Sequence, residues 1–224
     1  MQWKILRLTE QTSGAAYGAT ARPVEERMKS LFPQLKADNR PSVVWFQDLE
    51  DGKTIQRCEG SIFQNENVGL ALKRFHCFKV DIRALPSGDL QDKYLRQIGF
   101  FFFDPAADPI GKPIVGKRGT SLRGFQSAME RTWDTSFTMR LKEFTKKMKN
   151  ILDDFDKVDS KKQVLDRKKA KLDKKPNPAL AKSIEKEEAA LNEQKKVVEQ
   201  AEAAILAECS LKPKYLPEGG TDSE

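Results

Sequence analysis

Seven apolar residues in the second half of the chain follow a strict four-three spacing. They are Phe137, Leu141, Phe144, Met148, Ile151, Phe155 and Val158. This heptad spacing puts every apolar side chain on one stripe of an α-helix, and such a stripe needs a partner helix to cover it. The stripe continues more weakly at Leu165 and Leu172, with lysine at the alternate positions 162 and 169. The spacing therefore predicts a long helix that packs against another helix.

The partner helix is expected directly after it. The stretch KKPNPALAKS interrupts the helical pattern, and Asn177 followed by Pro178 is typical of an N-cap and a first helical turn. Apolar residues then recur at helical spacing, at Leu180, Ile184, Leu191, Val198 and Ile205. We predict an antiparallel coiled-coil hairpin over residues 134–208, with its turn at 174–178 and arms roughly 45–55 Å long.

Charge is distributed unevenly over this hairpin. Residues 140–175 hold 14 basic and 7 acidic residues, a net of +7, whereas residues 176–208 hold 4 and 7, a net of −3. Opposite charges on the two arms favour their pairing. The stretch RKKAKLDKK also contains the candidate anion-binding residues, which are Arg167, Lys168, Lys169, Lys171, Lys174 and Lys175. No aromatic residues interleave there for base stacking, so solvated lysines are the preferred interpretation.

The first part of the chain alternates between helix and strand patterns. The predicted elements, in order, are a helix at 24–35, a strand at 42–49, a helix at 65–76, a strand at 76–82, a short helix after Ser87, strands at 99–104 and 114–117, and a helix after Ser121. Strands separated by helices predict an α/β fold, a mixed sheet with helices on both faces. The run GFFFFD is typical of a strand that is buried on both faces. This domain is expected to span residues 23–133, between an N-terminal strand or flexible segment at 1–22 and, beyond the hairpin, a flexible tail at 209–224.

Several short sequence motifs in this domain follow one another in a recognisable order. VVWFQ is followed by Glu59 and Phe63, four residues apart, and then by QNENV, LALKRFHCFKVDI, FFFFDP and IVGKRG. Over about residues 24–133 the chain resembles the thioredoxin-like superfamily, in the branch of the disulfide-relay thiol domains. The resemblance implies a thioredoxin-like fold with a C-x-x-C motif directly after VVWFQ.

The expected cysteines are absent. The resemblance places them near Gly52 and Ile55, in GKTI, and it places a cis-proline at about Ile98, although no proline occurs between Gln91 and Asp104. A dithiol exchange cycle needs an attacking and a resolving thiol. The resemblance therefore implies a redox-inactive member.

Cys58 leaves an alternative open, because CEGS is a C-x-x-S word of the kind that monothiol members carry. At a helix N-terminus its thiol pKa would be lowered, and the protein would then be a monothiol thiol-disulfide or peroxide oxidoreductase. The preferred interpretation is an ordinary loop thiol. LEDGK also reads as a tight turn, which would make TIQRCE a returning strand.

Other candidate residues are given structural roles. His76 and Cys77 are predicted to form a packed interior pair, and Asp81 and Asp104 to cap turns. The three cysteines and the single histidine have no metal-ligand spacing, and no cofactor motif is present, so neither a metal nor a cofactor is expected. No apolar run approaches the ~20 residues of a membrane span, and MQWKILRLTEQ lacks a signal-peptide core, so a cytoplasmic protein is expected.

The expected function is that of a non-catalytic interaction or assembly module. The heptad residues from Phe137 to Val158 include three phenylalanines, which an alanine-rich partner helix covers poorly. Surplus apolar surface suggests a homodimer or larger assembly through the hairpin, or docking to another protein. Catalysis by Cys58 is the first alternative, and binding of nucleic acid or an anionic surface by the basic helix is the second.

Overall fold

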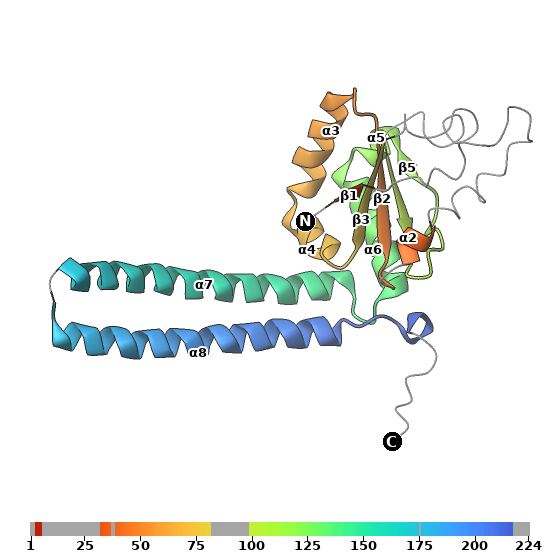
Figure 1. The fold of residues 1–224 in the computed structure, drawn as a ribbon. Helices are drawn as coiled ribbons and strands as arrows, with labels where there is room; N and C mark the ends of the chain where they lie inside the picture. Colours follow the sequence, from red (N-terminus) through yellow and green to blue (C-terminus); the bar gives the residue numbers. More distant parts are fainter. Residues whose placement is uncertain (1–2, 6–31, 37–38, 82–98, 175, 217–224) are drawn as a thin grey trace, which may run out of the picture. The chain divides into compact units, whose positions relative to one another are not determined.

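A mixed β-sheet forms the centre of the first part of the chain (Figure 1). The computed structural model describes residues 3–5, 32–36, 39–81, 99–174 and 176–216. The chain divides into two compact units, one of residues 1–141 and 211–224 and one of residues 142–210. We call the first unit the head and the second unit the hairpin.

The sheet of the head has the strand order β1-β3-β2-β4-β5. The strands are β1 (Lys4–Ile5), β2 (Ser42–Gln47), β3 (His76–Asp81), β4 (Gly99–Phe103) and β5 (Ile114–Val115). β1, β3 and β2 run parallel, whereas β4 is antiparallel to β2 and β5 is antiparallel to β4. The sheet is therefore mixed, as predicted, and the N-terminal segment contributes an edge strand.

The central strands are buried on both faces. All six residues of β2 are buried, and in β4 only Phe101 is half-buried. On one face, the rings of Trp45 and Phe100 are 5.5 Å apart, and Phe100 meets Phe125 edge to face at 4.8 Å. On the other face, Val44 is also buried. The continuous apolar run in the sequence thus correctly predicts a two-sided strand.

Helices connect and cover these strands. α3 (Gly52–Cys58), the π-helical turn η2 (Glu59–Phe63) and α4 (Glu66–Leu72) link β2 to β3, and α5 (Gly116–Gly119) and α6 (Leu122–Ser136) follow β5. The predicted caps are present: Asn65 Oδ1 accepts from the Val68 N–H at 3.2 Å, and Ser121 Oγ accepts from the Gly124 N–H at 3.1 Å. α2 (Phe32–Lys36) overlaps the end of the helix expected at 24–35, and residues 24–31, like the helix expected after Ser87, lie outside the described residues.

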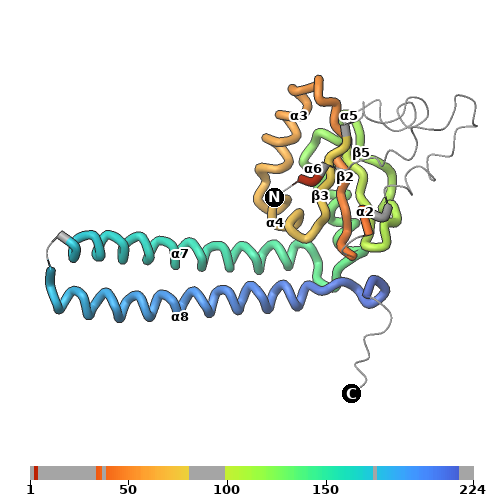
Figure 2. Tube along the Cα trace, in the orientation of Figure 1, coloured from red at the N-terminus to blue at the C-terminus, as the bar shows by residue number. Residues whose placement is uncertain are grey.

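The hairpin consists of α7 (Leu141–Lys174) and α8 (Pro178–Glu208), which run side by side in opposite directions (Figure 2). Asn177 Oδ1 caps α8 by accepting from the N–H groups of Ala179 and Leu180 at 3.0 and 3.3 Å. Between the helices, a core of Ile151, Val158 and Val198 is extended by Phe155, Leu191, Ala201 and Ile205. The part of the predicted seam from Ile151 to Val158 therefore packs α7 on α8.

The segment after α8 returns to the head. Leu211 pairs with Phe137 in an isolated antiparallel bridge, and the Lys212 N–H donates to the Ser136 carbonyl at 2.9 Å. In the turn η5 (Pro213–Tyr215), the Tyr215 hydroxyl donates to Asp104 Oδ2 at 2.7 Å. The expectation of a loose tail is therefore wrong for residues 211–216, because backbone and side-chain hydrogen bonds hold them.

Candidate functional site

Gly52 and Ile55, the positions to which the resemblance assigns cysteines, lie at the N-terminus of α3. Asp51 is the N-cap of this helix, and its Oδ1 accepts from the Thr54 N–H at 3.1 Å. Hydrogen bonding with Thr54 holds the pKa of the Asp51 carboxyl below its usual range. The alternative of a tight turn and a returning strand is wrong, because this cap starts a helix at Gly52.

GKTI occupies the first turn of α3 and contains no thiol. Gly52 is exposed, and a Cβ placed there would meet no atom within 4 Å. Ile55, three positions later, is half-buried. The two positions to which the sequence resemblance assigns cysteines thus lie in the first turn of α3, and neither carries a thiol.

Cys58 does not occupy a site that activates a thiol. The expectation that it lies in a loop is wrong, because it is the last residue of α3 and the helical backbone continues from it into η2. Its side chain is fully buried, and burial raises the pKa of the thiol to about 11. At pH 7 a thiol with that pKa is ionised in about one molecule in ten thousand. Ser61, the last residue of the C-x-x-S word, donates its hydroxyl to the Arg57 carbonyl at 2.6 Å.

The other residues singled out in the head have structural surroundings. His76 and Cys77 are buried, as predicted, and burial raises the pKa of the Cys77 thiol to about 12. Asp104 caps a turn, also as predicted, because its Oδ1 accepts from the N–H groups of Ala106 and Asp108 at 2.9 Å each. The side chain of Asp81 lies outside the described residues.

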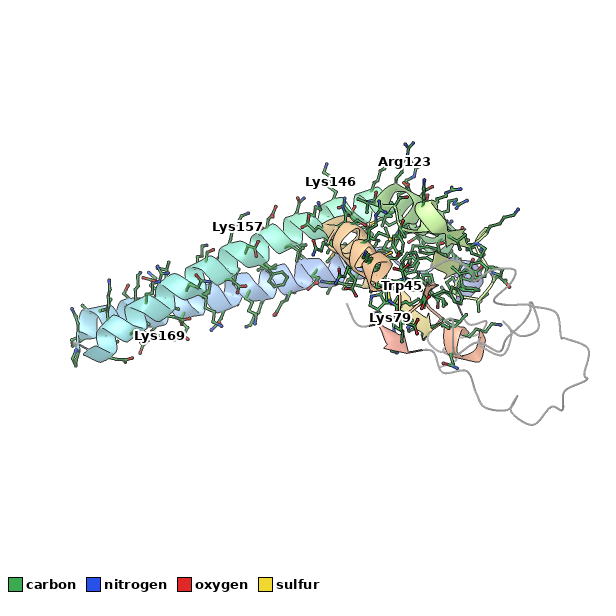
Figure 3. All side chains as sticks on the ribbon, turned by 90° about the horizontal axis from the view of Figure 1, so that it is seen from above. Trp45, Lys79, Arg123, Lys146, Lys157 and Lys169 are labelled. Atoms are coloured by element: carbon green, nitrogen blue, oxygen red, sulfur yellow. The ribbon has the colours of Figure 1, made fainter. Side chains whose placement is uncertain are left out.

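An aromatic cluster joins β2 to η2 in the head, and the sequence alone did not reveal it. Trp3, Trp45 and Phe63 lie with ring centroids 5.0 to 5.5 Å apart. The Lys79 ammonium lies 5.0 Å from the centre of the Trp45 ring and 5.9 Å from that of Trp3, and Figure 3 labels Trp45 and Lys79. The half-buried Trp3 and Lys79 cover the edge of this cluster. The spacing of this cation over two indole rings is that of a cation–π contact, which stabilises the head.

The predicted interaction seam is largely interior in the single chain. Six of its seven side chains are buried, and Phe155 is half-buried. Phe137 is not part of α7: it is the C-cap of α6, with extended backbone at φ −109° and ψ 156°. The extended backbone there lets it pair with Leu211. An interface with another chain therefore has to use other residues of the hairpin.

The candidate anion-binding residues are partly occupied. Lys168 Nζ lies 2.7 Å from Glu187 Oε2, and Lys169 Nζ lies 2.7 Å from Glu188 Oε1. Arg167 and Lys171 are exposed. The side chain of Lys174 and the whole of Lys175 lie outside the described residues. α8 thus neutralises part of the basic stretch, as its acidic composition predicted.

A groove on one side of the hairpin is a second feature that the sequence alone did not reveal. It has a volume of about 410 Å³, and it is lined by Ser160, Lys161, Val164, Leu165, Glu187, Ala190, Leu191 and Gln194. Val164 is 50% exposed, and Val197 on α8 is 57% exposed. The signal in the sequence was the position of these two valines beside the seam, where a polar residue is usual in a solvated helix.

Comparisons with known proteins add no relative. The sequence has no significant match to a protein-family model or to a curated protein, and the fold has none to a solved structure. Among the residues that the structure describes, no three His, Cys, Asp or Glu side chains gather in a way that would hold a metal ion. Within the same residues, no helix combines the length and the apolar character that crossing a bilayer requires.

Proposed function

We propose that this protein is a redox-inactive thioredoxin-like protein that acts as a non-catalytic interaction or assembly module. The head supports the fold assignment through its mixed sheet. β2 leads directly into α3 and continues to the parallel strand β3, and the antiparallel strands β4 and β5 precede α6. This arrangement is compatible with a thioredoxin-like fold.

The observation that carries the proposal is the first turn of α3. The sequence resemblance predicts a dithiol at positions 52 and 55, and these positions lie at the start of a helix that follows the central strand β2. A helix N-terminus favours a thiolate, so this location supports the idea that the fold could suit a dithiol there. Gly52 and Ile55 supply no thiol, and the buried Cys58 and Cys77 have raised pKa values.

The hairpin supports the second half of the proposal. Its helices have 34 and 31 residues, about 50 Å each at 1.5 Å per residue. They are joined by ion pairs at both ends of their contact, with Lys147 Nζ 2.8 Å from Glu208 Oε2 near the base and Lys168 with Glu187 nearer the turn. A long two-helix element of this kind offers a large surface for another chain and carries no chemistry of its own.

Thiol exchange tests the proposal directly. The wild type is expected to catalyse no reduction of a protein disulfide, and its native thiols are expected to react slowly with an alkylating agent at pH 7. The double variant Gly52→Cys with Ile55→Cys should then form a reversible disulfide, with one thiol pKa below the ordinary value of about 8.5.

The matched control places the same two substitutions, three residues apart, in the middle of α8, as Asn192→Cys with Lys195→Cys. No helix N-terminus acts on that pair, so its thiol pKa should stay ordinary. Rapid labelling of Cys58 in the wild type would overturn the redox-inactive assignment. Ordinary pKa values at both positions of the α3 variant would argue against the thioredoxin-like assignment.

A further inference from the structure

The groove-bearing side of the hairpin differs from the rest of its surface. Among the described residues, the large apolar side chains that are strongly exposed are Leu49, Val164, Val197 and Leu216. Val164 lines the groove, and Val197 is seven residues, two helical turns, beyond the groove residue Ala190. Both valines therefore lie on the groove side of the hairpin.

The two helices contribute different chemistry to this side. On α7, Val164 lies in a row with lysines at helical spacing, at positions 157, 161, 168 and 171. On α8, the row through Ala190 and Val197 contains small and acidic or amide residues, namely Ser183, Glu187, Gln194, Ala201 and Ala204. The groove thus has a basic wall and a wall without lysine.

We infer that this groove is the self-association site of the protein, and that a second copy of the hairpin occupies it face to face, with α7 of each copy over α8 of the other. This inference rests on the proposed assembly function and specifies its partner. The second hairpin is the occupant because its α8 arm complements the basic α7 arm in charge: residues 176–208 have a net charge of −3 and residues 140–175 a net charge of +7. Within each copy Glu187 already pairs with Lys168, so the α8 row of the second copy offers the lysine row mainly small residues and the net charge of its arm.

Charge selects one symmetry for the pair. A two-fold axis along the length of the hairpin places basic α7 on α8 of the partner, with adjacent helices antiparallel. An axis across the hairpin would instead stack α7 on α7 and bring the lysine rows together, which is unfavourable. With the favoured axis, the end of one hairpin at which α7 begins and α8 ends lies beside the same end of the other hairpin.

The register within the hairpin fixes which residues then meet. Lys161 Nζ donates to Gln194 Oε1 at 2.8 Å and Lys168 pairs with Glu187, so Val164 lies level with Ala190 and Leu191. A rotation about the long axis keeps each residue at its own level. Val164 of one copy therefore faces Ala190 of the other, and this contact occurs twice, once on each side of the axis.

The available area suits a stable dimer. A helix of 31 residues is roughly 46 Å long, and two helices side by side are about 20 Å wide. One face of the hairpin therefore offers roughly 900 Å², compared with about 800 Å² per partner in a standard interface. The result is a four-helix bundle formed by two chains.

Sedimentation of the full chain over a range of concentrations tests this inference. The wild type should be a dimer, and Val164→Lys with Val197→Lys should raise the dimer dissociation constant roughly 100-fold, because four like charges then enter one groove. The control, Ala170→Lys with Ala203→Lys, adds the same charges at exposed positions away from the groove and should remain dimeric. Circular dichroism of both variants verifies that the helices persist.

Disulfide cross-linking tests the geometry separately. Differently tagged chains carrying Val164→Cys and Ala190→Cys should cross-link when mixed, and neither variant should cross-link with itself. A Val164→Cys chain that cross-links with itself would show α7 over α7 and would overturn the proposed symmetry. A wild type that is monomeric at all concentrations, or a Val164→Lys with Val197→Lys variant that is still dimeric, would overturn the inference. The thiol-exchange results, on which the redox-inactive assignment depends, would be unaffected by either outcome.

Discussion

The head and the hairpin bury their apolar side chains in different ways. In the head, aromatic rings from β2, β4, η2 and α6 meet although they are far apart in sequence, as with Trp45 and Phe100. In the hairpin, residues at heptad spacing on one helix meet similar residues on a neighbouring helix, and polar pairs such as Lys168 and Glu187 line the edge. The head therefore depends on a few large contacts, and the hairpin on many small ones.

This difference predicts how much stability each unit loses when one buried side chain is truncated. Removing one ring from the core of the head should lower the free energy of unfolding strongly, because many side chains surround that ring. A residue in the two-helix seam has fewer neighbours, so its truncation should cost less. The two units can also be followed separately, because all three tryptophans belong to the head and the long helices belong to the hairpin. Tryptophan fluorescence therefore reports on the head, and circular dichroism reports mainly on the hairpin.

The largest effect is expected in the head, from Phe100→Ala. Phe100 is fully buried and contacts Trp45, Phe63 and Phe125. Its truncation should lower the free energy of unfolding by about 3–5 kcal/mol, and urea unfolding followed by fluorescence measures this. Leu49→Ala, at a 61% exposed position, is the control and should change stability by less than about 0.5 kcal/mol. A loss of helical signal at the same urea concentration would mean that the two units unfold together, and it would contradict the separate treatment of head and hairpin.

A smaller effect is expected from Ile151→Ala in the hairpin. Ile151 is 6% exposed and packs with Val158 and Val198. The loss should be about 2–3 kcal/mol, near the lower end for a buried aliphatic residue. Circular dichroism should detect the shift while the fluorescence transition stays in place. Val164→Ala, on the exposed side of the same helix, should leave the circular dichroism transition nearly unchanged once the chain is dilute enough to be monomeric.

Tyr215→Phe removes one hydrogen bond between the returning segment and the head. The bond to the Asp104 carboxylate should contribute about 1–2 kcal/mol. Burial, together with the hydrogen bond to Asp104, raises the pKa of the Tyr215 hydroxyl above its usual value. The contribution is therefore complete below pH 10 and decreases as the pH rises toward the folded-state pKa. The wild type should lose stability between pH 9 and 11 by more than Tyr215→Phe does, and equal losses would contradict this role.

The smallest effect is expected from Glu187→Gln on the edge of the hairpin. Hydrogen bonds from Lys168 and then from Ser183 lower the pKa of the Glu187 carboxyl. The stabilisation is therefore present above the unfolded-state pKa and is lost as the pH falls through the folded-state value. Melting curves should differ slightly from wild type at neutral pH and low salt, and should coincide at high salt. A difference that persists at 1 M salt would point to packing instead of charge.

The fold was predictable where one local pattern determined it. The heptad spacing, Asn177 with its proline, and the opposite charges of the arms led to α7, α8 and their antiparallel pairing. The run GFFFFD led to a strand buried on both faces. In each case a short stretch of sequence determines the periodicity or the cap, so no distant residue has to be known.

The parts that sequence did not predict depend on distant contacts. The pairing of Phe137 with Leu211 ends the heptad stripe before α7 begins, although the spacing itself continues through Phe137. The candidate site was predicted from the resemblance alone, which assigns two thiols to GKTI, and the structure adds that GKTI begins a helix. The exposure of Val164 and Val197 was not predictable, because it depends on how far the neighbouring helix covers each side chain.

The return of Leu211 to the head has a consequence for the order in which the molecule is assembled. Lys212 and Asp134 are 78 positions apart, and Tyr215 and Asp104 are 111 positions apart. Closing loops of that length in a disordered chain carries a large entropic cost. A hairpin forms from local contacts, and once formed it brings its own two ends together, which shortens the effective loop to a few residues. The ribosome releases the segment after α8 only once α7 and α8 have emerged, so the head acquires its hydrogen bonds to this segment after the hairpin has closed.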